Sequence, residues 1–342
     1  MRAVLLHGHG GFERLEVRDD VPVPAPGDGE VLVKVLAAGV NNTDINTRVG
    51  WYASDIDVAA VGWSGDVPPF PRIQGADACG RIVSVGAGVD STRVGERIIV
   101  EPVFRAATDP SSPPLYFGAE VDGAFAEYTV VPSRHALRVD CAWSDAALAS
   151  IPCSYSAAEN MLSRSRVVGG ETVVVTGASG GVGSAAVQLA SRRGARVIAL
   201  AASAKPDEVR ELGADEVLPR DGDVVASLGR KSVDVVIDVV GGPLWSRLLS
   251  VLRPRGRYAT SGAIAGPRVE LDLRTLYLND LTLFGCTVLD ADVFANLVGY
   301  IERSEIRPVV AATFSLGDIV AAQQLFLTKQ HVGKIVLTVG SG

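Results

Sequence analysis

The fold is decided by the run Val173-Val174-Val175-Thr176-Gly177-Ala178-Ser179-Gly180-Gly181-Val182-Gly183, in which an apolar strand leads into a glycine-rich turn. A helix is expected directly after it, over Gly183–Arg193. The spacing Ala178-x-Gly180-x-x-Gly183 is typical of a dinucleotide-binding turn, where small residues let the backbone approach a pyrophosphate and the helix pack closely. The helix N-terminus would supply free N–H groups and the positive end of its dipole to the phosphates. The predicted cofactor contacts here are Thr176, Ala178, Ser179, Gly180, Gly181, Val182 and Gly183.

Strands and helices alternate on both sides of this turn. The expected strands are Glu171–Thr176, Arg196–Ala201, Val233–Val239 and Gly256–Thr260. The expected helices are Asp207–Leu212 and Pro243–Leu252, and Val269–Cys286 adds more strand-like sequence. Near-continuous apolar strands between helices indicate a parallel sheet with helices on both faces.

The flanking regions have a different pattern. Residues 1–135 are β-rich, with short β-branched runs separated by Gly and Pro turns: Glu30–Leu36, Gly80–Val85, Glu96–Val100 and Ala126–Val131. Two long irregular stretches, Ala53–Pro71 and Phe104–Gly118, interrupt this region, and loops of such length are often functional. The tail is expected to hold helices around Ala291–Glu302 and Leu316–Leu327 and a closing strand, Gly333–Val339.

Composition argues against several classes of protein. The 342 residues carry a net charge of −7, which argues against a nucleic-acid binder. The four cysteines form no CxxC pair, which argues against a disulfide framework. No run of about 18 uncharged apolar residues occurs, so no membrane span is predicted. The N-terminus lacks the pattern of a secretory signal, and we expect a cytoplasmic protein.

The end of the second strand bears on the choice of dinucleotide. An acidic residue about 20 positions after the glycines would bind the ribose 2′-OH of NAD. The run Val197–Lys205 has no carboxylate there, whereas Ser203 and Lys205 offer a donor and a cation that suit the 2′-phosphate of NADP. The alternative is that Lys205 is a solvated surface lysine. We therefore expect NADPH as the cofactor.

At this point the chain resembles the medium-chain dehydrogenase/reductase family, and within it the zinc-free quinone oxidoreductase-like branch. The motifs that carry the resemblance are Gly39-Val40-Asn41-Asn42-Thr43-Asp44, Arg48-x-Gly50-x-Tyr52, Gly75-x-Asp77-x-x-Gly80, Asp122-Gly123-Ala124-Phe125-Ala126-Glu127-Tyr128 and His331-Val332-Gly333-Lys334.

The resemblance implies an α/β fold of two parts. One is a GroES-like distorted β-barrel catalytic domain, and the other is a Rossmann cofactor domain with a doubly wound parallel sheet. The expected divisions are a catalytic domain at 1–135, the Rossmann domain at 136–288 and the rest of the catalytic domain at 289–342. A homodimer through the edge strand near Leu281–Thr287 is also implied.

The metal ligands of the zinc alcohol dehydrogenases in this family are largely replaced. Those enzymes carry a cysteine where Asn41 stands, a histidine-glutamate pair where Ala76-Asp77 stands, and a cysteine near Cys153. Only the last is kept, and catalytic zinc needs about three protein ligands. We therefore expect no zinc. The alternative is an altered metal site made of Cys153 with Asp77 and Asp44.

Without a metal, an activated acceptor is the easier substrate, because a quinone or an α,β-unsaturated carbonyl is its own electron sink. The predicted function is therefore NADPH-dependent hydride transfer to a quinone or an α,β-unsaturated carbonyl, with a small molecule as the partner. Two alternatives stay open: an alcohol or ketone dehydrogenase that uses the altered metal site, and an NADPH-binding regulatory or structural protein without turnover.

The resemblance also implies the site residues. Tyr52, Asn41 and Asp44 would line the catalytic cleft, with Tyr52 as the candidate hydrogen-bond donor to the developing oxygen anion, because a phenol stays protonated at neutral pH. The alternative is that Tyr52 is a packing aromatic whose hydroxyl binds the backbone, and the proton could come from water. Asn41 would donate through its amide or form a turn, and Asp44 would order the loop or pair with Arg48 rather than act as a base. The further predicted cofactor contacts are Arg220, Asp238, Val240, Ser261, Gly262 and Lys334. For Lys334 the alternative is a surface lysine without a cofactor contact.

Overall fold

The computed structural model describes residues 1–52, 70–105, 113–202 and 205–340. The chain forms two compact units, Met1–Cys153 with Pro308–Gly342, and Ser154–Arg307. Most of the predicted loop Ala53–Pro71 and part of Phe104–Gly118 lie outside the described residues, as does Ser203.

The predicted divisions at 136 and 289 both precede those of the two units. The difference comes from two helices. One was expected in the Rossmann domain but belongs to the first unit, and the other was expected in the catalytic domain but belongs to the second unit. Helix α2 (Asp145–Ala149) contacts strands β3 (Glu30–Val40) and β5 (Asp77–Val85) of the first unit. Helix α9 (Val293–Glu302) belongs to the second unit, where it buries Phe294 and Leu297.

The first unit is a β-structure closed by the C-terminal tail. Its main sheet has the order β10-β6-β5-β3-β18-β17, with β9 also paired to β3, and a smaller sheet has the order β2-β1-β4. The strands are β1 (Ala3–Leu6), β2 (Leu15–Arg18), β3 (Glu30–Val40), β4 (Arg72–Ile73), β5 (Asp77–Val85), β6 (Arg97–Val100), β7 (Val103–Phe104), β8 (Leu115–Tyr116), β9 (Tyr128–Pro132), β10 (Ala136–Arg138), β17 (Val310–Ser315) and β18 (Lys334–Thr338). The helices are α1 (Asn42–Val49), α2 (Asp145–Ala149) and α10 (Ile319–Thr328).

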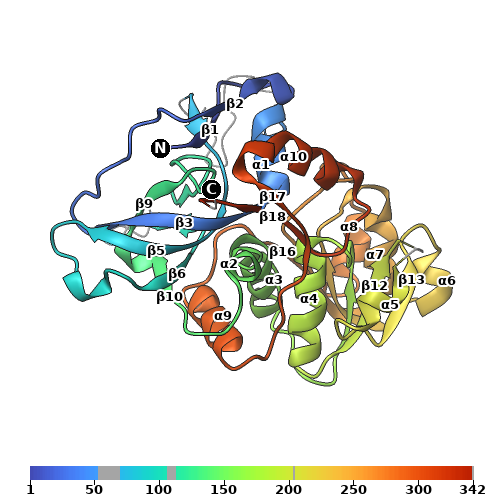
Figure 1. Ribbon diagram of the computed structural model, residues 1–342. Helices are drawn as coiled ribbons and strands as arrows, with labels where there is room; N and C mark the ends of the chain where they lie inside the picture. Colours follow the sequence, from blue (N-terminus) through green and yellow to red (C-terminus); the bar gives the residue numbers. More distant parts are fainter. Residues whose placement is uncertain (53–69, 106–112, 203–204, 341–342) are drawn as a thin grey trace. The chain divides into compact units, whose positions relative to one another are not determined.

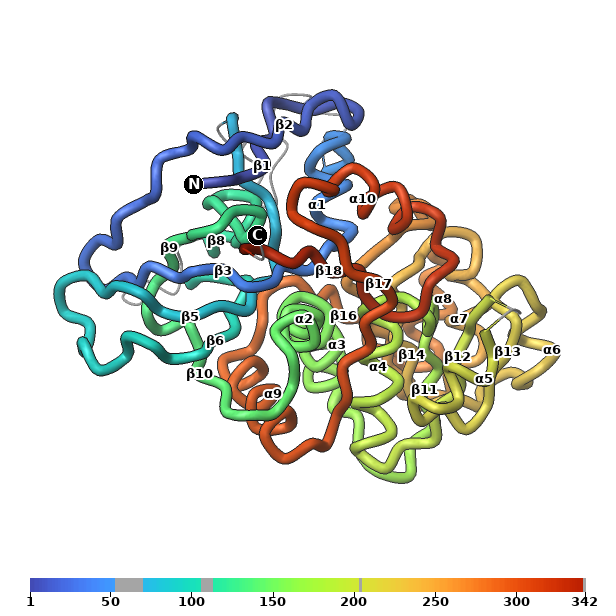
Figure 2. The backbone as a smooth tube through the Cα atoms, in the orientation of Figure 1, coloured from blue at the N-terminus to red at the C-terminus, as the bar shows by residue number. Residues whose placement is uncertain are grey.

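The tail strand β18 matters for the site because it lies antiparallel to β3, with Ile335 opposite Val40. Figure 2 shows this red C-terminal strand beside the blue strand β3. The pairing places the start of β18 next to the end of β3, where the chain turns into α1. Alternating apolar residues of β3, such as Val31, Val33 and Val35, are fully buried in the core of this unit.

The second unit is built on a six-stranded sheet with the order β13-β12-β11-β14-β15-β16, in which every neighbouring pair is parallel. Its strands are β11 (Thr172–Val175), β12 (Arg196–Ala201), β13 (Glu216–Pro219), β14 (Val233–Asp238), β15 (Leu252–Thr260) and β16 (Thr282–Gly285). Its helices are α3 (Pro152–Arg164, which begins at the division), α4 (Gly181–Arg192), α5 (Pro206–Arg210), α6 (Val224–Leu228), α7 (Trp245–Val251), α8 (Leu273–Tyr277) and α9 (Val293–Glu302). Figure 1 shows α4 to α6 with the strands β12 and β13, coloured from green to yellow, and Figure 2 also labels β11. This strand order is that of the Rossmann fold, with its switch point between β11 and β14.

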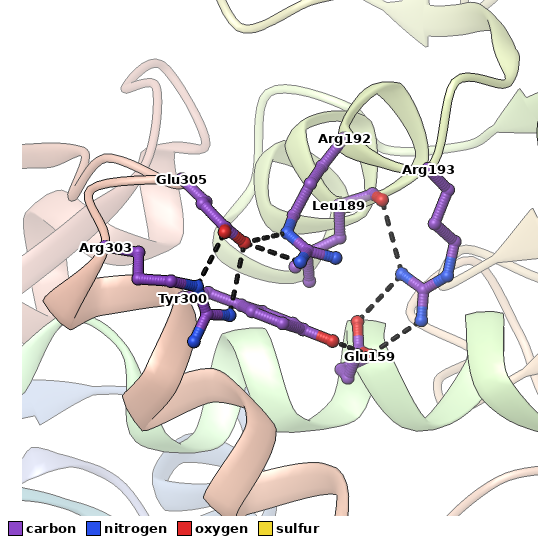
Figure 3. Close-up of polar contacts among 7 residues, drawn as sticks. All are labelled: Glu159, Leu189, Arg192, Arg193, Tyr300, Arg303 and Glu305. Atoms are coloured by element: carbon purple, nitrogen blue, oxygen red, sulfur yellow. Dashed lines mark hydrogen bonds and ion pairs between the residues drawn. The ribbon is translucent and has the colours of Figure 1, made fainter.

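The buried carboxylate of Glu159 and the arginines around it connect three helices of the second unit (Figure 3). The carboxylate of Glu159 on α3 accepts hydrogen bonds from Arg193 at 2.9 and 2.6 Å, just after α4. Tyr300 on α9 donates to the same carboxylate at 3.3 Å, and the guanidinium of Arg192 lies 3.6 Å from the centre of its ring. These contacts hold the C-terminal end of α4. The N-terminal end of the same helix begins at the glycine turn.

Candidate active site

The glycine turn lies at the switch point of the parallel sheet, as its sequence predicts. Strand β11 ends at Val175, Gly177 adopts a left-handed conformation with φ 57°, and Gly180 is the N-cap of α4. A Cβ atom on Gly183 would lie 2.1 Å from the carbonyl oxygen of Gly177, so only glycine lets the helix approach the turn this closely. The first N–H groups of α4 have no partner within the helix, and this turn therefore fits the phosphates of a dinucleotide.

Asp238 organises the neighbouring strand end from inside the protein. Its Oδ1 accepts hydrogen bonds from the Thr176 hydroxyl at 2.5 Å and from the backbone N–H of Val240 at 2.8 Å. Its other oxygen accepts from the hydroxyl of Tyr258. The side chain is fully buried. Asp238 therefore ties together the ends of β11, β14 and β15, and its predicted part in cofactor binding would be to shape the turn that carries Val240.

Two cations lie beyond the end of the second strand, β12. The backbone N–H of Lys205 donates to Ala202, and that of Arg220 donates to Ala201, so both residues are anchored at the same strand end. Burial lowers the pKa of Lys205, with Glu208 acting in the opposite direction and the charge of Arg220 lowering the pKa further. Lys205 is only 8% exposed and is not a solvated surface lysine. Ser203 lies outside the described residues.

Ser261 and Gly262 directly follow β15, the strand next to β14 in the sheet. The Thr260 hydroxyl donates to the carbonyl oxygen of Gly262 at 3.2 Å and holds this turn. The two residues thus follow the same edge of the sheet as the glycine turn. Their contact with a nicotinamide ring stays a prediction.

In the first unit, Asn41, Asp77 and Lys334 form a buried polar cluster. The ammonium of Lys334 lies 2.7 Å from Asp77 Oδ2 and 2.5 Å from Asn41 Oδ1, and it donates to the carbonyl oxygen of Val40 at 3.0 Å. The amide nitrogen of Asn41 donates to Asp77 Oδ2 at 2.8 Å. Both ends of the Asn41 amide are therefore engaged by protein groups. Lys334 is 3% exposed and is therefore not a surface lysine. Its contact with the phosphates of a cofactor stays a prediction.

Asp44 caps helix α1 and contributes to the same cluster. Its Oδ2 accepts a hydrogen bond from the backbone N–H of Asn41 at 2.7 Å. Burial raises the pKa of Asp44 to about 7; the Asn41 hydrogen bond and the Lys334 ammonium lower it, and the Asp77 carboxylate raises it. Asp44 is thus a capping residue whose carboxyl group exchanges its proton near neutral pH.

Arg48 has other partners than Asp44. Its guanidinium donates to the carbonyl oxygen of Gly10 at 2.9 Å and to the side chain of Gln323 at 3.1 Å. Of the two structural roles expected for Asp44, the structure therefore shows the ordering of the loop.

Tyr52 follows helix α1, which ends at Gly50 in the left-handed conformation with φ 70°. Its hydroxyl oxygen accepts a hydrogen bond from the Asn46 amide at 3.3 Å. Burial raises the pKa of Tyr52, whereas hydrogen bonds with Thr43 and Asn46 lower it, and the net direction is upward. The phenol therefore stays protonated at neutral pH, as a hydrogen-bond donor must.

The residues present do not fit a zinc ion. Cys153 donates its backbone N–H to Asp77 Oδ1 at 2.6 Å, and burial raises the pKa of its thiol to about 12, although a metal needs the thiolate. Within the described ranges, no three His, Cys, Asp or Glu side chains lie close enough to share an ion. The Lys334 ammonium instead lies among the oxygens of this cluster.

Sequence reasoning missed one contributor to the cluster, Gln74, and quoted another, Gly39, without a role. Gln74 is 1% exposed, donates to the carbonyl oxygen of Asp44 at 2.9 Å, and has a side-chain oxygen without a partner among the described residues. Gly39 is required because a Cβ atom there would lie 2.4 Å from Asp77 Oδ2. Gln74 directly precedes the motif Gly75-x-Asp77-x-x-Gly80, and this position was the only signal available for it.

The aromatic residues near the second irregular stretch have a structural part. Phe104 and Phe117 belong to the buried core of the first unit, with ring centres 5.7 Å apart.

Among the helices that the structure describes, none has the length and apolar character of a membrane span. The cytoplasmic location stays a prediction.

Comparison with known proteins agrees with this two-part organisation. Residues 27–140 match the family described as alcohol dehydrogenase GroES-like domain, and residues 181–303 match the family described as zinc-binding dehydrogenase.

Three individual proteins are similar over nearly the whole chain. The acryloyl-coenzyme A reductase of Metallosphaera sedula is 31% identical, over 99% of this chain and 100% of its own. The quinone oxidoreductase of Rattus norvegicus is 28% identical, over 98% of this chain and 97% of its own. A crystal structure from Sinorhizobium meliloti, provisionally described as an alcohol dehydrogenase, is 47% identical with a TM-score of 0.93, over 99% of this chain and 96% of its own.

Proposed function

Because the chain belongs to the medium-chain dehydrogenase/reductase family, and its relatives are oxidoreductases, we propose that it is an NADPH-dependent reductase of quinones or α,β-unsaturated carbonyls that works without zinc. The observation that carries the proposal is the polar cluster of the first unit, where an ammonium group lies among the side chains that would have to bind a metal. Two of the similar proteins, by their names, reduce acceptors of these kinds, an acryloyl thioester and a quinone.

The preference for NADPH rests on Lys205 and Arg220. Both follow strand ends at the edge of the sheet where a 2′-phosphate would lie, and no carboxylate ends β12 to bind a free 2′-OH. Two cations would bind a phosphate dianion more strongly than either alone. We expect Lys205→Ala and Arg220→Ala each to raise the KM for NADPH by about 10-fold and to leave the KM for NADH unchanged.

Arg230→Ala, which removes an exposed cation from the same unit, is the matched control. An equal loss with NADPH and NADH would contradict the assignment of the two residues. A wild-type preference for NADH would overturn the choice of cofactor itself.

In the proposed reaction the protein has two tasks. It positions the acceptor beside the cofactor, and it donates one hydrogen bond to the oxygen of the acceptor. NADPH, when bound, supplies the hydride. The carbonyl oxygen of the acceptor gains negative charge as the hydride arrives at the β-carbon, and a donor that stays protonated stabilises it. Tyr52 suits this role because its pKa is raised by burial, while its own oxygen is held by Asn46. The amide of Asn41 is less suited, since Asp77 and Lys334 already engage it.

A substrate screen that follows NADPH oxidation tests the proposed function. We expect turnover with enones or quinones, and we expect Tyr52→Phe to lower kcat by about 100-fold with little change in the binding of NADPH. Tyr128→Phe, on strand β9 of the same unit, is the control. Full kcat in Tyr52→Phe would show that another group, such as water, stabilises the developing negative charge on the oxygen.

Two alternatives differ from this proposal in measurable ways. An alcohol or ketone dehydrogenase with an altered metal site is favoured by the likeness to the Sinorhizobium meliloti structure. It requires about one metal ion per chain and activity that a chelator removes. A regulatory protein would bind NADPH tightly but turn over no member of a broad panel of enones, quinones and aldehydes.

A homodimer through strand β16 is part of the proposal. This strand lies at the edge of the six-stranded sheet, and such edges need covering. Exposed apolar side chains follow one another in and just after helix α8: Leu273, Tyr277 and Leu278 are 64%, 62% and 69% exposed. Light scattering of the wild type should give the mass of a dimer, and Leu278→Lys should shift it toward the monomer. A monomeric wild type would contradict this part of the proposal.

A further inference from the structure

The ammonium group of Lys334 is surrounded by protein oxygens, as a bound cation would be. Lys334 is the first residue of β18 and is 3% exposed. Its three donors meet three oxygens, which belong to Asp77, Asn41 and the backbone of Val40, at 2.7, 2.5 and 3.0 Å. A lysine ammonium can donate three hydrogen bonds and accept none. All three of its donors therefore have partners within this unit.

The groups around this cation are those that could otherwise take a metal. Asp77 and Asn41 bind it directly, Asp44 lies close enough for its charge to interact with it, and the backbone of Cys153 is fixed to Asp77. Carboxylate, amide and thiol groups are donors that bind divalent transition metals, although with Lys334 in place no three His, Cys, Asp or Glu side chains among the described residues lie close enough to share an ion. The oxygens of Asp77, Asn41 and the Val40 backbone converge on the ammonium, and its single positive charge compensates the charge of the Asp77 carboxylate.

We propose that Lys334 is a built-in cation that occupies the place of a divalent metal and keeps metal ions out of this cluster. The inference deepens the zinc-free part of the proposed function and rests on it. A divalent ion placed among these oxygens would either meet the fixed positive charge within a few ångströms or have to displace the side chain. Displacement would cost the ammonium its three hydrogen bonds and its pairing with a fully buried carboxylate.

The cation also has a positioning effect on its neighbours. By accepting from Lys334 through Oδ1, the Asn41 amide must present its nitrogen to Asp77. Asp77 in turn uses its other oxygen to bind the backbone N–H of Cys153 at the start of α3. One lysine therefore fixes both the orientation of an amide and the capping of a helix, a structural task that a bound metal ion could otherwise perform.

Cobalt binding tests the proposal without use of turnover. The wild-type protein, incubated with Co²⁺, should bind no stoichiometric ion and show no thiolate-to-cobalt absorption. Lys334→Ala should bind Co²⁺ at least about 100-fold more tightly than the wild type. It should also show the thiolate absorption, and the double variant Lys334→Ala/Cys153→Ser should lose it. Lys334→Arg, which keeps the charge, should behave like the wild type.

Each outcome decides the question. Wild-type protein that binds one Co²⁺ with an absorption dependent on Cys153 overturns the proposal. So does folded Lys334→Ala that binds Co²⁺ no better than the wild type. If Lys334→Ala fails to fold, Lys334→Gln removes the charge while keeping a donor for Asp77, and the same two readings apply. NADPH oxidation with enones on the same wild-type sample tests the proposed function separately, since metal binding can fail while turnover is present.

Discussion

The buried carboxyl group of Asp44 predicts a distinctive dependence of stability on pH. Its pKa is raised from 3.8 to about 7, with burial as the largest cause. The folded protein therefore holds this proton at pH values where the unfolded chain has released it. Stability from this group is fully present below the unfolded pKa and is lost as pH rises toward the folded pKa. The difference between the two pKa values corresponds to about 4 kcal/mol in total.

Asp44→Asn should remove this dependence while keeping an oxygen to accept the N–H of Asn41. Between about pH 5 and about pH 8, the free energy of unfolding of the wild type should fall by about 2.5 kcal/mol relative to that of the variant. Urea unfolding of both proteins across this range measures the difference, because all other titrating groups are shared. Infrared spectra should also show a protonated carboxyl group that titrates near neutral pH in the wild type only.

Asp28→Asn, which removes an exposed carboxylate from the same unit, is the control and should follow the wild-type curve. A difference between Asp44→Asn and the wild type that stays constant with pH would refute the reasoning, because the carboxyl group would then have the same pKa in both states.

Three further predictions concern other parts of the chain. Gly183→Ala places a Cβ atom 2.1 Å from the Gly177 carbonyl, and should weaken NADPH binding by at least about 10-fold in a fluorescence titration. Glu159→Gln removes the charge that pairs with Arg193 inside the second unit, and should lower its unfolding free energy by about 3 kcal/mol in chemical denaturation. The thiol of Cys153, whose pKa burial raises to about 12, should resist alkylation at neutral pH, as mass spectrometry would show.

Matched controls exist for each. Gly285→Ala adds a Cβ atom with no heavy atom within 4 Å, and should leave NADPH binding unchanged. Glu216→Gln breaks an exposed ion pair with Arg196, and should change stability by less than about 0.5 kcal/mol. Cys141 is half-buried, as Cys153 is, and should be alkylated first because the pKa of the Cys153 thiol is raised to about 12. Tight NADPH binding by Gly183→Ala would contradict the close approach of helix and turn. Unchanged stability of Glu159→Gln would contradict the importance of the ion pair with Arg193, and early labelling of Cys153 would contradict the raised pKa of its thiol.

The parts of the fold that depend on local sequence were predictable. The glycine turn from Gly177 to Gly183 carries its own spacing, and strand β12 begins and ends where its apolar run does. The strand β13 was missed because it is short and ends at Pro219. The segment Val269–Cys286, expected to be strand-like, contains helix α8, whose start is capped by the Asp272 side chain accepting from the N–H of Arg274.

The candidate site was predictable only as a set of positions. The motifs drew attention to Asn41, Asp44 and Asp77, but not to the partner that each one has. The contact between Lys334 and Asp77 joins residues far apart in the sequence, and depends on β18 pairing with β3. A lysine before a closing strand has no local feature that distinguishes a surface side chain from a buried one. Long-range pairing therefore decided what sequence patterns could not.

The most direct test of the central claim is a single measurement of metal content and NADPH oxidation on one purified sample. The account predicts turnover of an enone or a quinone by protein with far less than about one zinc ion per chain, and no loss of rate with a chelator. About one zinc ion per chain, with a rate that the chelator abolishes and added zinc restores, would contradict it.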